Sequence, residues 1–279
     1  MSVFAVELKM NFLPIHWPPG SALDLFEALV GPGKCFPMKR WGNELDNLLP
    51  EGDELYKFLS DLNETNSRIL LGRTGKEISN WKFEVSRSDP NMGPKPVTWR
   101  FFVLGRVPAL SRNIVDHFDN VLSAARVVGC HIVHFDLRHS NYATFSEKQN
   151  FAMAKTIKST VHEEATFGDW RGLSCVSWRL ALGSYYIDMF GEERLERLPQ
   201  ELGYRHSSGY WVLQTCENPE DSLDEQARSN EQKIIDILGQ EFFFNKETGE
   251  LPQVVPAFPL ELIPSDQALI DEYGPMLAD

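Results

Sequence analysis

Residues 3–12 (VFAVELKMNF) alternate between apolar side chains and smaller or polar ones, and this stretch decides how the chain is expected to fold. The apolar side chains that share one side of an extended chain are Phe4, Val6, Leu8, Met10 and Phe12. The other side carries Glu7, Lys9 and Asn11. A period of two is typical of a strand that covers a core with one face, so the sequence predicts a first strand here.

The same alternation returns in residues 81–86 and 97–104, around Trp81, Phe83 and Trp99. The segment between them, SDPNMGP at 88–94, is rich in turn-forming residues, which predicts an antiparallel pair joined by a loop. Further strands are expected at 130–137, 174–180 and 210–215.

Helical spacing of apolar residues predicts a helix over 114–128 behind a Ser111 cap. The other expected helices are 22–30 behind Ser21, 54–62, 146–160, 185–197 and 222–238. Strands and helices interleave without strict alternation, which favours the α+β class: a largely antiparallel sheet with packed helices in a single domain. We expect residues 1–245 to form this domain and residues 246–279 to form an acidic, proline-rich C-terminal arm.

Net negative charge is distributed unequally along the 279 residues. The chain has 27 Lys and Arg against 40 Asp and Glu, for a formal net charge of −13. From Glu217 to Asp279 there are 15 acidic and 3 basic residues, so nearly all of the excess lies in the last quarter. Such a chain is a poor ligand for nucleic acid, because duplex affinity comes mainly from basic side chains.

The remaining composition is that of an ordinary globular protein, with 42% hydrophobic residues. The N-terminal apolar run is interrupted by Glu7 and Lys9, and no other segment approaches the roughly 20 apolar residues of a membrane helix. The four cysteines form no C-x-x-C pair. These features predict a cytoplasmic protein with reduced cysteines, no cofactor and no membrane partner.

The segment CHIVHFDLRH at 130–139 is the best candidate metal site, because it gathers one thiol, three imidazoles and a carboxylate. On a strand, His134 and Asp136 would share a side, whereas His131 would face away, so ligands from elsewhere would be needed. A packed core histidine at His134 is the alternative. A metal-binding or small-molecule enzyme centred on His131, His134, Asp136 and His139 therefore stays open, although no motif indicates an enzyme.

The most distinctive stretch runs from Trp170 to Gln226. Its motifs are GLSCVSW at 172–178, LGSYY at 182–186, FGEE at 190–193, GYWVLQT at 209–215 and Asn218-Pro219. This succession resembles the type VI secretion immunity proteins of the domain of unknown function 3396 family, called TsiV-like. The Immunity protein 52 family, with a similar layout of strands and helices, is a near alternative.

The resemblance implies an inhibitor that binds and neutralises a cognate toxic effector, with nucleases whose DNA-binding clefts are basic among the effectors of such families. An acidic surface would be attracted to such a cleft. The expected partner-binding residues are Glu217, Glu220, Asp221, Asp224 and Glu225, with Tyr210 or Trp211 as an aromatic anchor. Two other interpretations remain: carboxylates at a helix N-terminus can be purely local, and the protein could be an adaptor that loads an effector for secretion.

Overall fold

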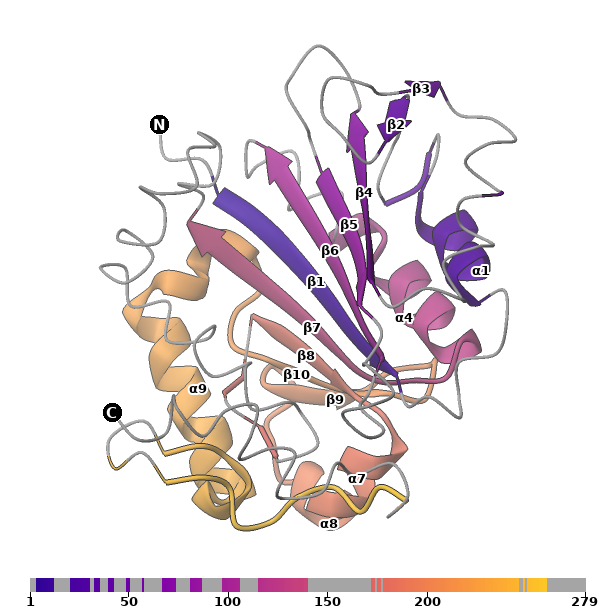
Figure 1. Ribbon diagram of the computed structural model, residues 1–279. Helices are drawn as coiled ribbons and strands as arrows, with labels where there is room; N and C mark the ends of the chain where they lie inside the picture. The colour runs from indigo at the N-terminus through magenta and orange to yellow at the C-terminus, as the bar shows by residue number, and fades with distance from the viewer. Residues whose placement is uncertain are drawn as a thin grey trace.

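A ten-stranded sheet forms the centre of the molecule in the computed structural model (Figure 1). The structure describes residues 4–12, 21–30, 33–35, 40–42, 49–50, 57, 67–73, 81–86, 97–105, 115–139, 172–173, 175–176, 178–245, 248 and 250–259. The strand order is β3-β2-β4-β5-β6-β1-β7-β8-β10-β9. The strands are β1 (Phe4–Phe12), β2 (Arg40–Gly42), β3 (Leu49–Pro50), β4 (Ser67–Arg73), β5 (Trp81–Ser86), β6 (Val97–Gly105), β7 (Cys130–His139), β8 (Arg179–Leu182), β9 (Gly203–Arg205) and β10 (Trp211–Gln214).

Every pair of neighbouring strands in this sheet is antiparallel. β1 lies between β6 and β7, so the strand predicted from the first residues occupies the interior of the sheet. Leu8, Met10 and Phe12 are buried, as the alternation predicts. β5 and β6 pair as expected, with Val85 opposite Trp99. The predicted α+β class with an antiparallel sheet is therefore confirmed.

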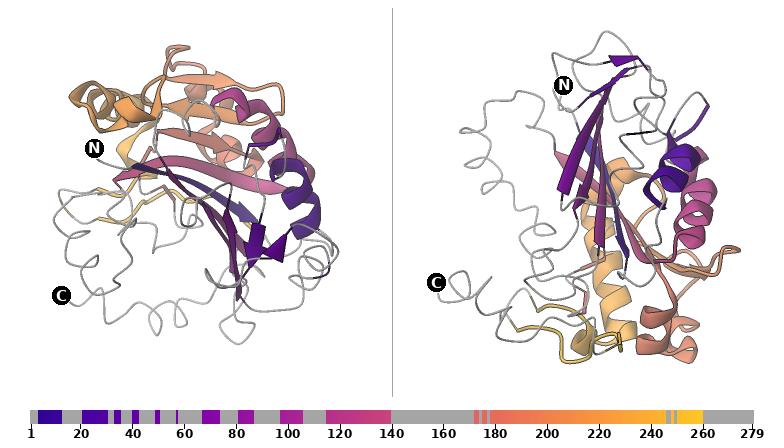
Figure 2. Two further views of the ribbon diagram at one scale, coloured as in Figure 1. Left: turned by 90° about the horizontal axis from the view of Figure 1, so that it is seen from above. Right: turned by 45° about the vertical axis from the view of Figure 1, so that its right-hand side comes forward.

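Two hydrophobic clusters pack against the sheet, and β7 contributes to both. Val133 and Phe135 belong to the first cluster, together with α1 (Ser21–Leu29) and α4 (Phe118–Val127). Ile132 belongs to the second cluster, with side chains of α7 (Ser184–Phe190), α8 (Glu192–Leu195) and α9 (Glu225–Leu238). Figure 2 shows α1 and α4 side by side and apart from α9. This half of the sheet is thus covered by helices on both faces.

A β-bulge at His131 adjusts β7 to this two-sided packing. Phe12 pairs with Cys130 and Asn11 with Ile132, which leaves His131 as the extra residue. The His131 carbonyl accepts a hydrogen bond of 2.9 Å from the amide of Gly183, the residue that precedes α7. A Cβ at Gly183 would lie 2.7 Å from that carbonyl oxygen, so only glycine allows this close approach.

Several predicted boundaries are wrong for local reasons. The strand expected at 174–180 is β8, which begins only at Arg179, since Cys175, Val176 and Trp178 before it are not in a strand. The helix expected at 185–197 is divided into α7 and α8 at Gly191, whose φ of 80° is incompatible with a continuous helix.

The last predicted helix also begins later than expected. Residues Pro219–Leu223 form the 3-10 helix η7, and α9 starts at Glu225. The side chains of α9 that the periodicity places inside, including Ala227, Ile234 and Leu238, are buried. α4 begins at Phe118 after a turn at His117, and the expected cap Ser111 lies outside the described residues.

Other predictions fall short in different ways. The sequence does not predict four of the strands: β2, β3, β4 and β9. Their apolar runs are too short or too irregular to show a clear alternation. The helices expected at 54–62, of which only Lys57 is described, and at 146–160 lie outside the described residues. Within the described residues, no helix combines the length and the hydropathy needed to span a bilayer.

The contact between Gly183 and His131 yields a test of the fold. We expect Gly183→Ala to lower the free energy of unfolding by about 1–3 kcal/mol, because the added methyl group meets backbone that cannot move aside. Ser184→Ala, at the exposed first residue of α7, is the matched control and should change stability by less than about 0.5 kcal/mol. Denaturation followed by tryptophan fluorescence measures both, and equal stabilities would contradict the assigned contact.

Candidate functional site

The acidic segment identified from the sequence forms the corner between β10 and α9. Glu217, Asp221, Asp224 and Glu225 are exposed, whereas the side chain of Glu220 is outside the described part of the chain. Asp224 is the residue that precedes α9, and its side chain makes no capping hydrogen bond. Asp224 and Glu225 are therefore exposed to solvent at the favourable end of the dipole of α9.

Hydrogen bonds hold this corner against the sheet. Asn230 of α9 donates from Nδ2 to the carbonyl oxygen of Thr215 at 2.8 Å. Glu231 accepts at Oε1 from the amide of Val176 at 3.3 Å. The indole of Trp178 donates from Nε1 to the carbonyl oxygen of Cys216 at 3.1 Å. The first bond joins α9 to the end of β10, and the other two join α9 and the residue after Thr215 to the segment that precedes β8, so the acidic segment has a fixed position relative to the core.

A buried arginine lies beneath the corner. Arg179 is only 8% exposed, and its guanidinium carbon is 4.7 Å from the centre of the Phe118 ring and 4.8 Å from that of Trp178. Nη2 donates to the carbonyl oxygen of Glu217 at 3.4 Å. These aromatic faces and the carbonyl group compensate for part of the lost hydration of the charge.

The electrostatic surroundings of Arg179 connect carboxylates from distant parts of the chain. Burial lowers the pKa of Arg179, and Tyr204, Cys216, Glu217 and Asp119 raise it in that order. Asp119 belongs to α4, so the positive charge lies between an acidic group of α4 and the acidic corner. We call the exposed carboxylates around this point the acidic surface, which consists of Asp119, Glu217, Asp221, Asp224 and Glu225.

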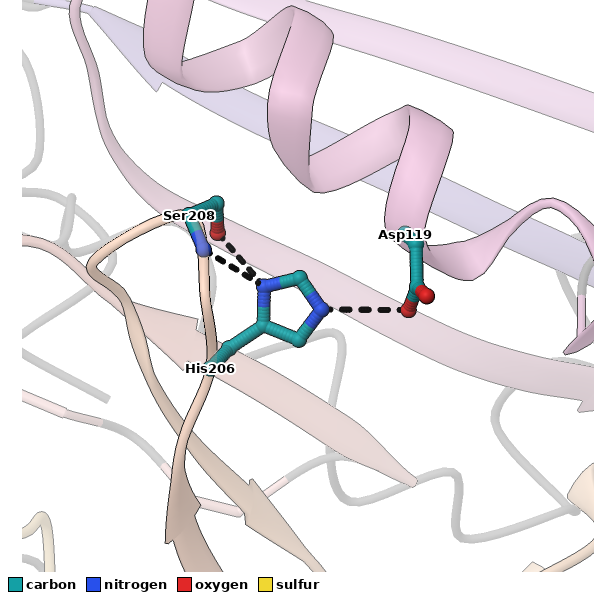
Figure 3. A network of polar contacts seen from close by, with 3 residues as sticks. All are labelled: Asp119, His206 and Ser208. Carbon is teal, nitrogen blue, oxygen red and sulfur yellow. Dashed lines mark hydrogen bonds and ion pairs between the residues drawn. The ribbon is translucent and has the colours of Figure 1, made fainter.

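Asp119 is joined to the hairpin between β9 and β10 by a small polar network (Figure 3). His206 Nε2 lies 3.1 Å from Asp119 Oδ1. His206 Nδ1 accepts from the amide of Ser208 at 3.1 Å and lies 2.6 Å from its Oγ. An acceptor at Nδ1 carries no proton, so Nε2 donates to the carboxylate. The imidazole thereby connects the hairpin to the first turn of α4.

Cys216 lies inside this region but is not activated as a nucleophile. Burial raises its pKa to about 11, the hydrogen bond with Thr215 lowers it, and nearby Asp221 raises it further. The thiol is therefore protonated at neutral pH, whereas a nucleophilic cysteine needs the thiolate. Burial also raises the pKa of Tyr204, although Arg179 lowers it.

The two aromatic residues expected to anchor a partner are in the core instead. Tyr210 has no exposed surface, and its hydroxyl donates to the carbonyl oxygen of Cys130 at 2.6 Å. Trp211 is 7% exposed and packs in the second cluster. Both side chains are buried, so neither is available as a surface anchor.

The histidine-rich strand also differs from its prediction. The bulge turns His131 toward Tyr186 and Phe258, members of the cluster that contains Ile132, so the expectation that His131 faces away is wrong. His134 is half-buried and lies opposite Leu180, whereas the side chains of Asp136 and His139 are not described. In the described portion, no three His, Cys, Asp or Glu side chains are grouped so that they could hold a metal ion.

Sequence patterns could not identify all of the acidic surface. Asp119 occurs in the sequence as one polar residue of a helix, 87 positions away from His206. Arg179 is a single charged residue in an apolar strand, with no motif around it. The pairing of β7 with β8 puts Phe135 opposite Arg179, and the packing of Arg179 on Phe118 brings it next to α4, which carries Asp119.

Comparisons with known proteins extend the description of the fold. No family model and no curated protein matches the chain. The structure is similar to that of the Pseudomonas aeruginosa T6SS protein PA0821, with a TM-score of 0.57 at 16% sequence identity. The match covers 100% of this chain and 88% of that protein. The chain therefore has a fold that is also found in a protein of the type VI secretion system.

Proposed function

We propose that this chain is a cytoplasmic immunity protein that neutralises a cognate type VI secretion effector by forming a stoichiometric complex. The effector we infer is an antibacterial nuclease with a basic cleft. Two likenesses support the proposal: the motifs between Trp170 and Gln226 resemble immunity proteins, and the whole fold is similar to that of a type VI secretion protein.

The observation that carries the proposal is the acidic surface. Its carboxylates come from α4, from the segment after β10 and from the start of α9. Asp119 is 83% exposed, which leaves its charge free to act over distance. Several exposed carboxylates on one side produce a negative potential that attracts a basic cleft and accelerates association.

The mechanism we propose is competition with the phosphate backbone of the nuclease's substrate. Basic side chains that bind phosphates would instead meet carboxylates carried on a fixed backbone. Arg179 and Asn230 bind the backbone carbonyl oxygens of Glu217 and Thr215, and His206 binds the carboxylate of Asp119. A fixed arrangement loses little conformational entropy on binding, which favours affinity. Because Tyr210 and Trp211 are buried, polar and electrostatic contacts would provide most of the specificity at this surface.

The other two interpretations from the sequence make different predictions. An adaptor would bind the effector but leave its toxicity unchanged. A metal-dependent enzyme would need ligands beyond His131, which packs among aromatic rings in this structure.

Co-expression tests the neutralising role directly. The product of the adjacent reading frame, expressed alone in a bacterial cytoplasm, should inhibit growth, and co-expression of this chain should restore growth. The two proteins should purify together at a fixed stoichiometry. Continued killing in the presence of a stable complex would support the adaptor and contradict the immunity role.

Charge reversal tests the proposed surface. Changing Glu217, Asp221, Asp224 and Glu225 together to lysine should slow association with the effector by roughly tenfold or more at low salt. The salt dependence of the association rate should also become weaker. Stopped-flow or surface-based kinetics at several salt concentrations measures both effects.

The matched control reverses four exposed carboxylates elsewhere: Asp188, Glu193, Glu196 and Asp236. It changes the net charge by the same amount but leaves the acidic surface intact. If both variants slow association equally, only the overall charge matters. If neither variant does, the acidic surface has no part in binding.

A further inference from the structure

The first residues of the expected C-terminal arm are packed against the domain. Phe258 is 5% exposed and belongs to the second hydrophobic cluster. Its ring centre is 5.1 Å from that of His131, 4.9 Å from that of Tyr185 and 6.2 Å from that of Tyr186. We call residues 250–259 the C-terminal strap, and these three rings of β7 and α7 the aromatic socket.

The strap has a second point of attachment at Gly172. Pro252 lies so close that a Cβ at Gly172 would be 2.5 Å from the Cβ of Pro252. Gly172 also has a φ of 102°, so both its backbone conformation and its neighbour require glycine. The strap therefore contacts the chain at Gly172, before β8, and then reaches the aromatic socket.

The backbone of the strap contributes little to its own attachment. It contains neither a helix nor a strand, and its one β-type contact is an isolated bridge between Glu250 and Asn245. The amides of Gln253 and Val254 donate to the same acceptor, the carbonyl oxygen of Glu241, at 2.8 and 3.0 Å. Among the described residues, the bonds after Val254 stay within the strap, with Phe258 donating to Pro256.

The outer side of the strap is apolar and open to solvent. Leu251, Val254 and Val255 are 38%, 37% and 45% exposed. These side chains are only partly buried, so most of the hydrophobic contact that holds the strap comes from Phe258 and Pro256, which are buried, and from the half-buried Pro252. Segments with few buried contacts and few backbone bonds open at a lower free energy than the core.

We propose that the C-terminal strap is a displaceable element that closes the aromatic socket with Phe258. It opens without unfolding of the sheet and uncovers the rings of His131, Tyr185 and Tyr186. The bulge at His131 places the histidine ring on the same face as the rings of α7, so that it forms part of the socket. This inference does not depend on the proposed immunity function.

Native-state hydrogen exchange of the full chain at increasing, sub-denaturing urea concentrations tests the strap. The amides of Gln253 and Val254 should exchange at least roughly tenfold faster than those of Val212 and Leu213 in β10. Their exchange should also depend less on urea, because opening the strap exposes less surface than global unfolding. Equal rates and equal urea dependence would show that the strap leaves only when the whole domain unfolds, which would overturn the proposal.

Two variants test whether the packing of Phe258 holds the strap in place. Phe258→Ala should accelerate exchange of the strap amides by at least a further tenfold or so while β10 stays protected. Val255→Ala, at an exposed position of the same strap, should leave the rates unchanged. Equal acceleration of the strap and β10 by Phe258→Ala would contradict independent opening. If that variant does not fold, the comparison within the unaltered chain still decides the question.

Discussion

Strand β7 is shared by both hydrophobic clusters, and the register of its pairing with β1 determines the rest of the described fold. Val133 and Phe135 enter the first cluster, whereas Ile132 enters the second. A slip of one residue would exchange these faces and place each side chain among the wrong helices. The bulge at His131 keeps the rest of β7 in register with β1, and its carbonyl group is the one that Gly183 approaches closely. The segment from β8 to α7 is therefore built on one edge of β7.

The same strand links the core to the acidic surface. Phe135 lies opposite Arg179, whose guanidinium group packs on Phe118 and Trp178 and reaches Glu217. A buried positive charge beneath exposed carboxylates reduces their mutual repulsion locally, while their outward sides remain negative. An interaction surface of this kind requires a rigid core, because charges on mobile segments would lose their arrangement.

The sequence was most informative where one face of an element meets one core. The stripe of α9 predicts its buried positions correctly, because a single periodicity describes it. The alternation at residues 3–12 predicts the burial of Leu8, Met10 and Phe12, but Asn11 on the opposite side is buried as well. The sequence was least informative where a strand is buried on both sides. Tyr210 and Trp211 look like surface candidates in the sequence, but Tyr210 is fully buried just before β10, and Trp211, Val212 and Leu213 of β10 are all buried.

By itself, the sequence determined the α+β class, the antiparallel pairing of its clearest strands and the concentration of acidic residues in the last quarter, because these follow from local periodicity and composition. Tertiary structure alone decided which carboxylates share a surface. Asp119 joins Glu217 there only because β7 and β8 pair and His206 reaches across to α4. It also decided that Phe258 belongs to the core. Contacts between residues this far apart depend on how the whole chain packs, and local residue patterns do not record that.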